Sequence, residues 1–432
     1  MTEFTGGSRA GKRREIDRRC ALKTLAGAAA ASLAPSSLLS PSLLAREPRS
    51  SASPAAAPAK NPSWFGFNLL EYFSTDPDWM KYFPYKDDGM FPEDDFRWIS
   101  DWGFNWVRLP MDYRFWTDPN DPMKIDEAKV QPIDRAVRLG EKYGVHVNIC
   151  LHRAPGYCIL DTMNEALTGI HITKEKTDLF TDPKTLDAFL HQWTFFAQRY
   201  KGIPSARVSF NLMNEPLLFF PPRNSHIFSS YDWKPFYSDP RWIAGEKKYA
   251  RVARAAVKAI RAVDPDRLIV TDGLLGGSLP IPLLIDTGIT QSAHDYTPVL
   301  LTHYRCEWAR GMVPLNTPLP AWPLKDAQGK IICDASMLQE RYSAWKIELH
   351  QGVPIHFGEM GCYKHTPPEV VYRWFDASLG MIRSLQSGFA LWNFRGPFGI
   401  LDTERAGTKF EDWHGHQLDR TLLALLQGKM KS

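Results

Sequence analysis

Two glutamates in the sequence stand where a carboxyl group could do chemistry. Glu215 follows the apolar run of "VSFNLMNEP" and precedes Pro216, and Glu359 stands near the end of a similar run, "PIHFGEM". Two carboxyl groups that face one pocket are the minimum apparatus for cleaving a glycosidic bond. One protonates the leaving oxygen while the other attacks the anomeric carbon or activates water. The pair predicts this chemistry if the fold brings the two runs together.

The elements that must position these glutamates follow a repeating pattern. From Trp64 onward, short strand-forming runs alternate with longer segments whose apolar residues lie three and four positions apart. Strands are predicted at 64–70, 104–110, 146–152, 208–216, 267–273, 298–304, 354–360 and 389–395. Apolar runs without polar alternation indicate a parallel sheet covered on both faces. Eight such units predict an α/β fold, a single (β/α)8 TIM barrel with long loops after the strands.

A doubly wound open sheet is the competing architecture. Such a sheet usually carries a glycine-rich first turn, and no GxGxxG follows the first predicted strand. Eight units in a row also fit one barrel better than two smaller domains. In a barrel, the C-terminal ends of the strands form the catalytic face, so Glu215 and Glu359 are expected at the same rim.

Five motifs at these strand ends together resemble glycoside hydrolase family 5, the cellulase-like members of glycoside hydrolase clan A. They are Asn-Glu-Pro in the fourth run, Gly-Glu in the seventh, "VRLP" in the second, Leu-His in the third and Leu-Trp in the eighth. The resemblance covers almost everything after Trp64. It implies a retaining mechanism in which Glu215 is the acid/base and Glu359 is the nucleophile that forms a glycosyl-enzyme.

The resemblance also implies roles for supporting residues. Arg108 matches the arginine that favours the charged form of the nucleophile, and Asn214 matches the residue that holds the sugar 2-hydroxyl. His152 matches the histidine after strand three, and Trp392 matches the tryptophan under the sugar at the cleavage point. Ordinary alternatives exist, such as a salt bridge for Arg108 or a turn for Asn214. Their shared place at the same end of each strand favours the functional interpretation.

The sixth strand departs from the family pattern of a histidine, one residue and a tyrosine that contacts the nucleophile. "LLTHYRCEW" has His303 and Tyr304 side by side, whereas the earlier "SAHDYTP" has His294 and Tyr296 at the family spacing. We predict Tyr304 for this role because "PVLLTHY" is the better strand. Alternation along that strand then places Thr302, and not His303, in the histidine position, so the histidine assignment stays open.

Aromatic residues are frequent near the predicted strand ends. Sugar rings present a face of C–H groups that packs on aromatic rings, so a glycan groove is expected to be lined by Trp, Tyr and Phe. Trp308, after the sixth run, is one candidate for substrate contact. Any single aromatic residue of this group could instead pack within its own loop.

Charge is unevenly distributed along the chain. The first 60 residues carry ten Lys or Arg against four Asp or Glu, and the remainder carries 42 against 44. The apparent basicity therefore belongs to the N-terminal segment. The rest of the chain shows no excess of positive charge that would favour binding to nucleic acid.

The start of the chain is predicted to be an export signal followed by a linker. Residues 1–45 resemble a twin-arginine export signal, because "DRRCALKTLAGAAAASLA" joins paired arginines to an apolar run too short to span a bilayer. A disordered basic tail is the alternative. Residues 46–62 are a Pro, Ala and Ser linker that is predicted to be disordered, and residues 63–432 form the catalytic barrel. The mature protein is expected in the periplasm or outside the cell, without a membrane span.

No cofactor or metal ion is predicted. The five cysteines after the leader are Cys150, Cys158, Cys306, Cys333 and Cys362, and their spacing lacks the CxxC pattern of thiolate metal sites. Cys150 and Cys158 could pair. The first predicted strand also has no His-x-His pair, which metal hydrolases on this fold ordinarily show.

The sequence therefore predicts a monomeric retaining glycoside hydrolase that acts on a β-linked glycan, with a cellulose-type β-glucan as the leading substrate. Alternatives on the same fold are a β-mannanase and a β-glucosidase or transglycosylase. A non-catalytic carbohydrate-binding barrel would lack one of the two glutamates, and both are present. The linkage, the sugar and endo or exo action are left open.

Overall fold

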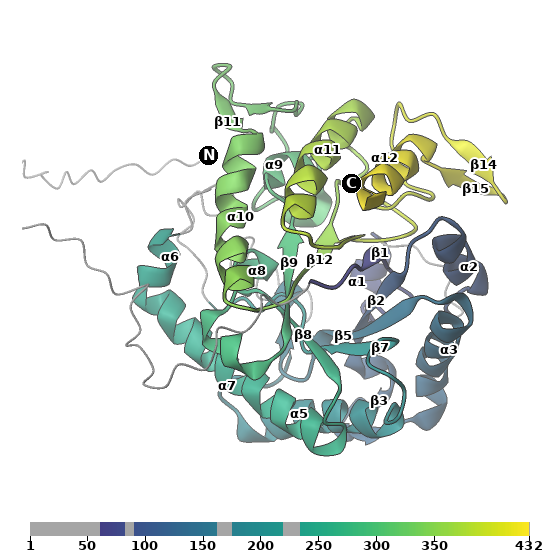
Figure 1. Cartoon of the computed structure of the whole chain (residues 1–432), viewed down its shortest axis with the longest axis vertical. Helices are drawn as coiled ribbons and strands as arrows, with labels where there is room; N and C mark the ends of the chain where they lie inside the picture. Colours follow the sequence, from purple (N-terminus) through teal and green to yellow (C-terminus); the bar gives the residue numbers. More distant parts are fainter. Residues whose placement is uncertain (1–60, 83–89, 162–174, 219–233, 432) are drawn as a thin grey trace, which may run out of the picture. The chain divides into compact units, whose positions relative to one another are not determined.

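Eight parallel strands close into a barrel within the residues that this computed structural model describes, 61–82, 90–161, 175–218 and 234–431 (Figure 1). In chain order they are β1 (Phe65–Asn68), β2 (Trp106–Asp112), β5 (His146–Ala154), β7 (Val208–Asn211), β8 (Leu268–Asp272), β9 (Thr290–Asp295), β12 (Ile355–Met360) and β13 (Phe389–Leu391). Each strand pairs in parallel with the next, and β13 pairs with β1 to complete the circle. The predicted (β/α)8 barrel is confirmed.

One predicted strand was wrong. The run 298–304 is not the sixth strand, because its centre forms the short helix α9 (Val299–Thr302). The sixth strand is β9, and it comes from the polar sequence "TQSAHD", all six residues of which are buried. Its polar groups find partners inside the protein: Gln291, for example, accepts a hydrogen bond from the Ile281 N–H and donates one to the Ile281 carbonyl. The apolar character of the run 298–304 therefore led to the wrong prediction of the sixth strand.

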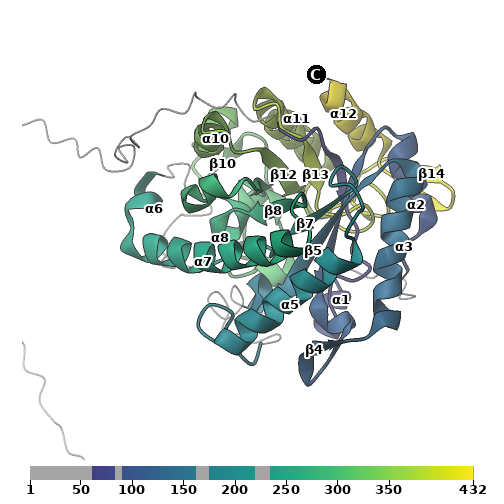
Figure 2. The ribbon, with the colours of Figure 1, turned by 60° about the horizontal axis from the view of Figure 1, so that its bottom comes forward.

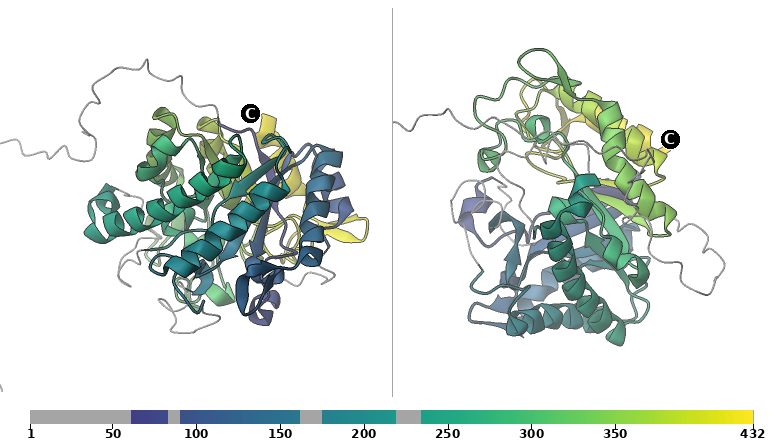
Figure 3. Two further views of the ribbon diagram at one scale, coloured as in Figure 1. Left: turned by 90° about the horizontal axis from the view of Figure 1, so that it is seen from below. Right: turned by 90° about the vertical axis from the view of Figure 1, so that its left-hand side faces the viewer.

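Helices cover the outside of the strands, as the views in Figures 2 and 3 show. The long ones are α2 (Glu93–Asp101), α3 (Glu127–Tyr143), α5 (Pro183–Arg199), α7 (Pro240–Val263), α10 (Ala335–His350), α11 (Pro368–Ser384) and α12 (Arg420–Lys431). Four of them begin after an aspartate that accepts a backbone N–H of the first turn, Asp126, Asp182, Asp239 and Asp334. Helices α5 and α7 lie side by side (Figures 1 and 2).

The main hydrophobic core lies between the strands and this ring of helices. Trp193 of α5 packs on Phe210 of β7, with ring centroids 5.4 Å apart. On the other side of the barrel, Tyr342 of α10 packs on Phe357 of β12 at 5.3 Å. Large aromatic side chains in such contacts bury much apolar surface, so they fix each helix against its strand. The strand ends are thereby held in place for the site.

Shorter helices, turns and hairpins lie in the loops. They are α1 (Pro77–Met80), α6 (Lys234–Ser238), α8 (Leu274–Gly277), three 3₁₀ turns (Tyr113–Phe115, Pro282–Thr287, Glu307–Ala309), β6 (Tyr157–Cys158), and the hairpins β3 (Thr117–Asp118) with β4 (Asp121–Ile125), β10 (Leu324–Lys325) with β11 (Ile331–Cys333), and β14 (Glu411–Trp413) with β15 (His416–Leu418). Strand β6 folds back antiparallel on the end of β5.

Three further sequence expectations concern the N-terminal segments, the cysteines and a membrane span. The predicted export signal, 1–45, and nearly all of the linker, 46–62, lie outside the described residues, so both stay predictions. The five cysteines after the leader are all buried, and no disulfide joins Cys150 to Cys158. Within the described ranges, no helix combines the length and the apolar character that crossing a membrane requires.

Gly66 offers a test of the barrel geometry. A Cβ atom at this position would lie 1.7 Å from the carbonyl oxygen of Trp106 on the neighbouring strand β2. Strand backbone cannot yield as a flexible side chain can, so Gly66→Ala should lower the free energy of unfolding by about 3 kcal/mol or more. Gly428 in α12 has no atom within 4 Å of an added Cβ. Gly428→Ala should instead raise stability, by about 1 kcal/mol at most. Equal effects in denaturant unfolding would contradict this packing.

Candidate active site

The two glutamates predicted from the sequence face each other at the C-terminal rim of the barrel. Glu359 lies in β12, and Glu215 follows the end of β7. One carboxylate oxygen of each, together with a ring nitrogen of His294, lie within 4.8 Å of one another. Both glutamates line a cleft that encloses about 1020 Å³, open solvent included. The fold therefore brings together the carboxyl pair that the chemistry requires.

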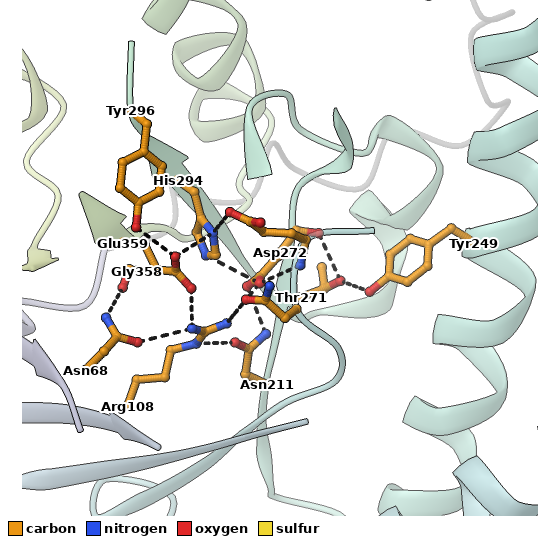
Figure 4. Close-up of polar contacts among 12 residues, drawn as sticks. Asn68, Arg108, Asn211, Tyr249, Thr271, Asp272, His294, Tyr296, Gly358 and Glu359 are labelled. Atoms are coloured by element: carbon orange, nitrogen blue, oxygen red, sulfur yellow. Dashed lines mark hydrogen bonds and ion pairs between the residues drawn. The ribbon is translucent and has the colours of Figure 1, made fainter. Parts of the chain in front are cut away.

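Arg108 of β2 is the centre of the polar network beneath the cleft (Figure 4). Its NH1 group donates to Glu359 Oε1 at 2.5 Å, and its NH2 group lies 3.1 Å from Asp272 Oδ2. Three amide oxygens complete its shell, those of Asn211 at 2.7 Å, Asn214 at 2.8 Å and Asn68 at 3.1 Å. The guanidinium group thus uses its rigid fork to hold five side chains at once.

His294, at the end of β9, joins the two glutamates. Its Nδ1 lies 2.8 Å from Glu215 Oε1 and 3.5 Å from Glu359 Oε2, and its Nε2 lies 3.3 Å from Asp272 Oδ2. Burial opposes the charged form, but the carboxylates of Glu359 and Asp272 outweigh burial and raise the pKa of His294 to about 10. His294 is therefore an imidazolium at neutral pH.

Asp272, the last residue of β8, is the fully buried counterion of both cations. Burial favours its neutral form, yet the charges of His294 and Arg108 lower the pKa of Asp272 to about 2. Its carboxylate also accepts the Glu215 N–H at 3.1 Å and the Asn211 side-chain amide at 2.9 Å. Asp272 thus connects the charge network to the backbone of Glu215.

Opposing influences act on the pKa of Glu359. Burial raises the pKa of Glu359 above its ordinary value, and the positive charges of His294 and Arg108 oppose that rise. Tyr296, just after β9, donates its hydroxyl to Glu359 Oε2 at 3.0 Å. Loss of any one of these three partners would favour the neutral acid, which is a poor nucleophile.

The tyrosine predicted at the nucleophile was therefore wrong. Tyr296, and not Tyr304, contacts Glu359, and its partner at the family spacing is His294. Tyr304 follows helix α9, is buried, and is absent from the residues that line the cleft. His303 does line the cleft, where burial lowers its pKa to about 4.

The remaining predicted residues also reach the site. His152, Trp308 and Trp392 line the cleft, and the rings of His152 and Trp392 lie 5.5 Å apart. Asn214 is fully buried, and its side-chain oxygen accepts a hydrogen bond from Arg108. The buried Asn214 Nδ2 and both ring nitrogens of His152 have no hydrogen-bond partner among the described residues. Such atoms are suited to meet polar groups of a bound molecule.

A metal ion does not fit this donor set well. Glu215, His294 and Glu359 each offer an atom of a type that divalent cations accept. A cation among them would lie beside the Arg108 guanidinium, which contacts Glu359. It would also require His294 to lose a proton that its carboxylate neighbours hold strongly. The charges present favour a site that works through protons and carboxylates.

Comparison with known proteins agrees with this geometry. Residues 57–396 match the family profile described as cellulase (glycosyl hydrolase family 5). The chain belongs to glycosyl hydrolase family 5. It is therefore a glycoside hydrolase of the cellulase family, as the motifs at the strand ends predicted.

Individual relatives support the membership of this family 5 enzyme. A solved structure described as a glycoside hydrolase is 34% identical, with a TM-score of 0.71, and the match covers 85% of this chain and 99% of that one. Endoglucanase C of Acetivibrio thermocellus is 22% identical over 330 residues, which are 71% of this chain and 85% of the relative. Cel5A of Thermotoga maritima, solved with mannotriose, shares the fold at 20% identity and a TM-score of 0.59, over 84% and 97% of the two chains.

Sequence reasoning missed three residues of this family 5 site. Asn68, Asn211 and Asp272 are buried polar residues at the ends of β1, β7 and β8, and all three contact Arg108. The sequence did indicate these residues, because each of the three polar side chains interrupts an apolar run at its C-terminal end. A search for polar residues at the strand ends, which pointed to the two glutamates, could also have found these three residues.

The charge state of His294 can be measured directly. In an NMR pH titration of protein with labelled histidines, His294 should stay protonated to about pH 10, whereas His303 in the same cleft should be neutral above about pH 4. Because folding raises the pKa of His294, its contribution to stability should be complete below about pH 6.5 and disappear as the pH rises through about 10. Titration of His294 near pH 6.5 would contradict the network.

Proposed function

We propose that this protein is a retaining hydrolase of β-linked glycans that works by double displacement, with Glu359 as nucleophile and Glu215 as acid/base. The observation that carries the proposal is the approach of the two carboxylates to within 4.8 Å at one cleft. Retaining enzymes hold their carboxyl groups about 5 to 5.5 Å apart, whereas inverting enzymes leave room for a water between them.

In the first step, Glu359 attacks the anomeric carbon while Glu215 gives a proton to the glycosidic oxygen as the bond to the leaving group breaks. Arg108 and Tyr296 hold the Glu359 carboxylate in place from two sides. Glu215 suits the donor role because its side chain is the more exposed of the two, at 15% against 4%. The leaving sugar can therefore reach it from the cleft.

In the second step, water attacks the glycosyl-enzyme on the face that the leaving group has vacated. Glu215, now a carboxylate, accepts the proton of that water, and Glu359 is released. We assign to Asn214 Nδ2, which has no hydrogen-bond partner among the described residues, the role of donating to the sugar 2-hydroxyl, a contact that gains strength in the transition state. Two inversions at one carbon give a product with the β configuration of the substrate.

A β-glucan of the cellulose type is the proposed substrate. Support comes from the name of the relative Endoglucanase C and from the aromatic lining of the cleft, which includes Trp79, Trp308 and Trp392. A β-mannan is the second candidate, because the similar Cel5A structure contains mannotriose. Product sizing on both polysaccharides distinguishes the two.

We also propose that the enzyme acts as an exported monomer. Every residue of the charge network comes from one chain, so a single subunit is sufficient for the chemistry. The twin-arginine-like sequence of residues 1–45 supports delivery to the periplasm or the cell exterior. Replacing Arg18 and Arg19 with lysine should stop export, which fractionation of cells would show.

Removal of the nucleophile gives the first test. Glu359→Ala should abolish hydrolysis of a dinitrophenyl β-glycoside, because no glycosyl-enzyme can form. Azide should restore turnover by entering the space of the lost carboxylate, and NMR should identify an α-glycosyl azide. A β-glycosyl azide, or full activity without azide, would contradict the assignment of Glu359.

Removal of the acid/base gives a different pattern. Glu215→Ala should lower kcat/KM on a natural glycan by about 100- to 10,000-fold, since its leaving sugar needs a proton. A dinitrophenyl leaving group needs none, so kcat/KM for its glycoside should change little. Steady-state kinetics on both substrates measures the contrast. An equal loss on the two would show that Glu215 is structural.

A further inference from the structure

We propose that Tyr157 is a positioning residue for the acid/base Glu215. Its hydroxyl group holds the backbone on both sides of Pro216 and so fixes the direction in which the Glu215 carboxyl group points. The inference rests on the proposed role of Glu215. Tyr157 lies in β6, outside the barrel strands from which the site was predicted.

The backbone of Glu215 needs such support because its conformation is unfavourable. Its φ is 47°, in the left-handed region that residues other than glycine rarely adopt. Strain of this kind persists only where the surroundings fix it, and it is concentrated at functional sites. Asp272 accepts the Glu215 N–H at 3.1 Å, and Tyr157 donates its hydroxyl to the Glu215 carbonyl at 2.8 Å. Two side chains thus hold the peptide groups before and after the strained residue.

Pro216 explains why one hydroxyl group has to serve two backbone groups. Proline has no N–H, so the first donor after Glu215 is the N–H of Leu217. That N–H donates to the Tyr157 hydroxyl at 2.7 Å. The hydroxyl therefore accepts from Leu217 and donates to Glu215, forming a bridge across the proline. Buried backbone groups require partners, and Tyr157 supplies both.

Tyr157 is itself held rigidly. It pairs with Ala154 of β5, and its ring packs edge-on against Phe180 with centroids 5.6 Å apart. Gly156, with φ of 74°, makes the turn, and a Cβ there would lie 2.3 Å from the Thr185 side chain. Burial raises the pKa of Tyr157 well above its ordinary value, so the hydroxyl keeps the proton that it donates. The hairpin has little freedom to shift.

The bridge acts on one catalytic group and not on the other. Glu359 is held through Arg108 and Tyr296, and among the described hydrogen bonds neither of these is joined to Tyr157 or to residues 215–217. Relaxation of the Glu215 backbone would move its carboxyl group out of hydrogen-bond reach of the glycosidic oxygen. Loss of the Tyr157 hydroxyl should therefore impair proton donation while attack by Glu359 continues.

The test uses Tyr157→Phe and a series of aryl β-glycosides from dinitrophenyl to phenyl. For dinitrophenyl, kcat/KM should stay within about twofold of the wild type; for phenyl it should fall about 100-fold, the lower end of what acid catalysis supplies. Tyr237→Phe is the matched control, because it removes one buried hydrogen bond, to the Pro280 carbonyl at 2.8 Å, outside the cleft lining. Tyr237→Phe should show no dependence on the leaving group.

The ratio of the two kcat/KM values does not depend on how much of a variant is folded, so a loss of stability cannot imitate the effect. In a Glu215→Ala background, Tyr157→Phe should cause no further loss on the phenyl substrate. Equal loss on all leaving groups, or the same further loss without Glu215, would overturn the role of Tyr157. Should Glu215→Ala itself show no leaving-group dependence, the proposed function fails instead.

Discussion

The buried ion cluster around Arg108 is the constraint on which the rest of the site depends. The Arg108 side chain is 1% exposed, and it is paired with Glu359 and Asp272. Removing one member of a buried ion pair is strongly destabilising because the other charge stays behind without a partner. His294 supplies a second positive charge, so two cations face the carboxylates. The two cations favour the ionised forms of Glu359 and Asp272, and these carboxylates in turn favour the charged form of His294.

This cluster explains why the site is spread over so many strands. Charges from β2, β8, β9 and β12 meet at one rim, and amides from β1 and β7 fill the gaps between them. A barrel can do this because each strand delivers its last residues to the same face. The helices pack outside and hold the strand ends, and α7 also reaches the network through Tyr249, whose hydroxyl is hydrogen-bonded to Thr271 of β8 (Figure 4). The charged groups of the network thus come from the strands and their ends, whereas the helices mainly supply packing.

Much of this arrangement could be predicted from the sequence. Seven of the eight strand runs overlap the observed strands, because their apolar residues face the helices. Glu215, Glu359 and Arg108 were found because they interrupt or end such runs within motifs. Strand β9 was missed because its polar residues have partners from distant segments, such as Tyr342 for Asp295 and Glu215 for His294, that no local pattern reveals. Asp272 does end an apolar run, but its role was missed because its two cations come from other strands and only the fold brings them together.

The closing pair of strands has a consequence for synthesis of the protein. Strand β13 must reach β1 before the circle is complete, and Leu391 of β13 pairs with Phe67 of β1, which precedes it by 324 positions. Arg108 leaves the ribosome long before Glu359, which is 251 residues further along. During that interval the guanidinium group has no carboxylate from β12 to pair with. The nascent chain is therefore without activity, and its barrel open, until β13 has been translated.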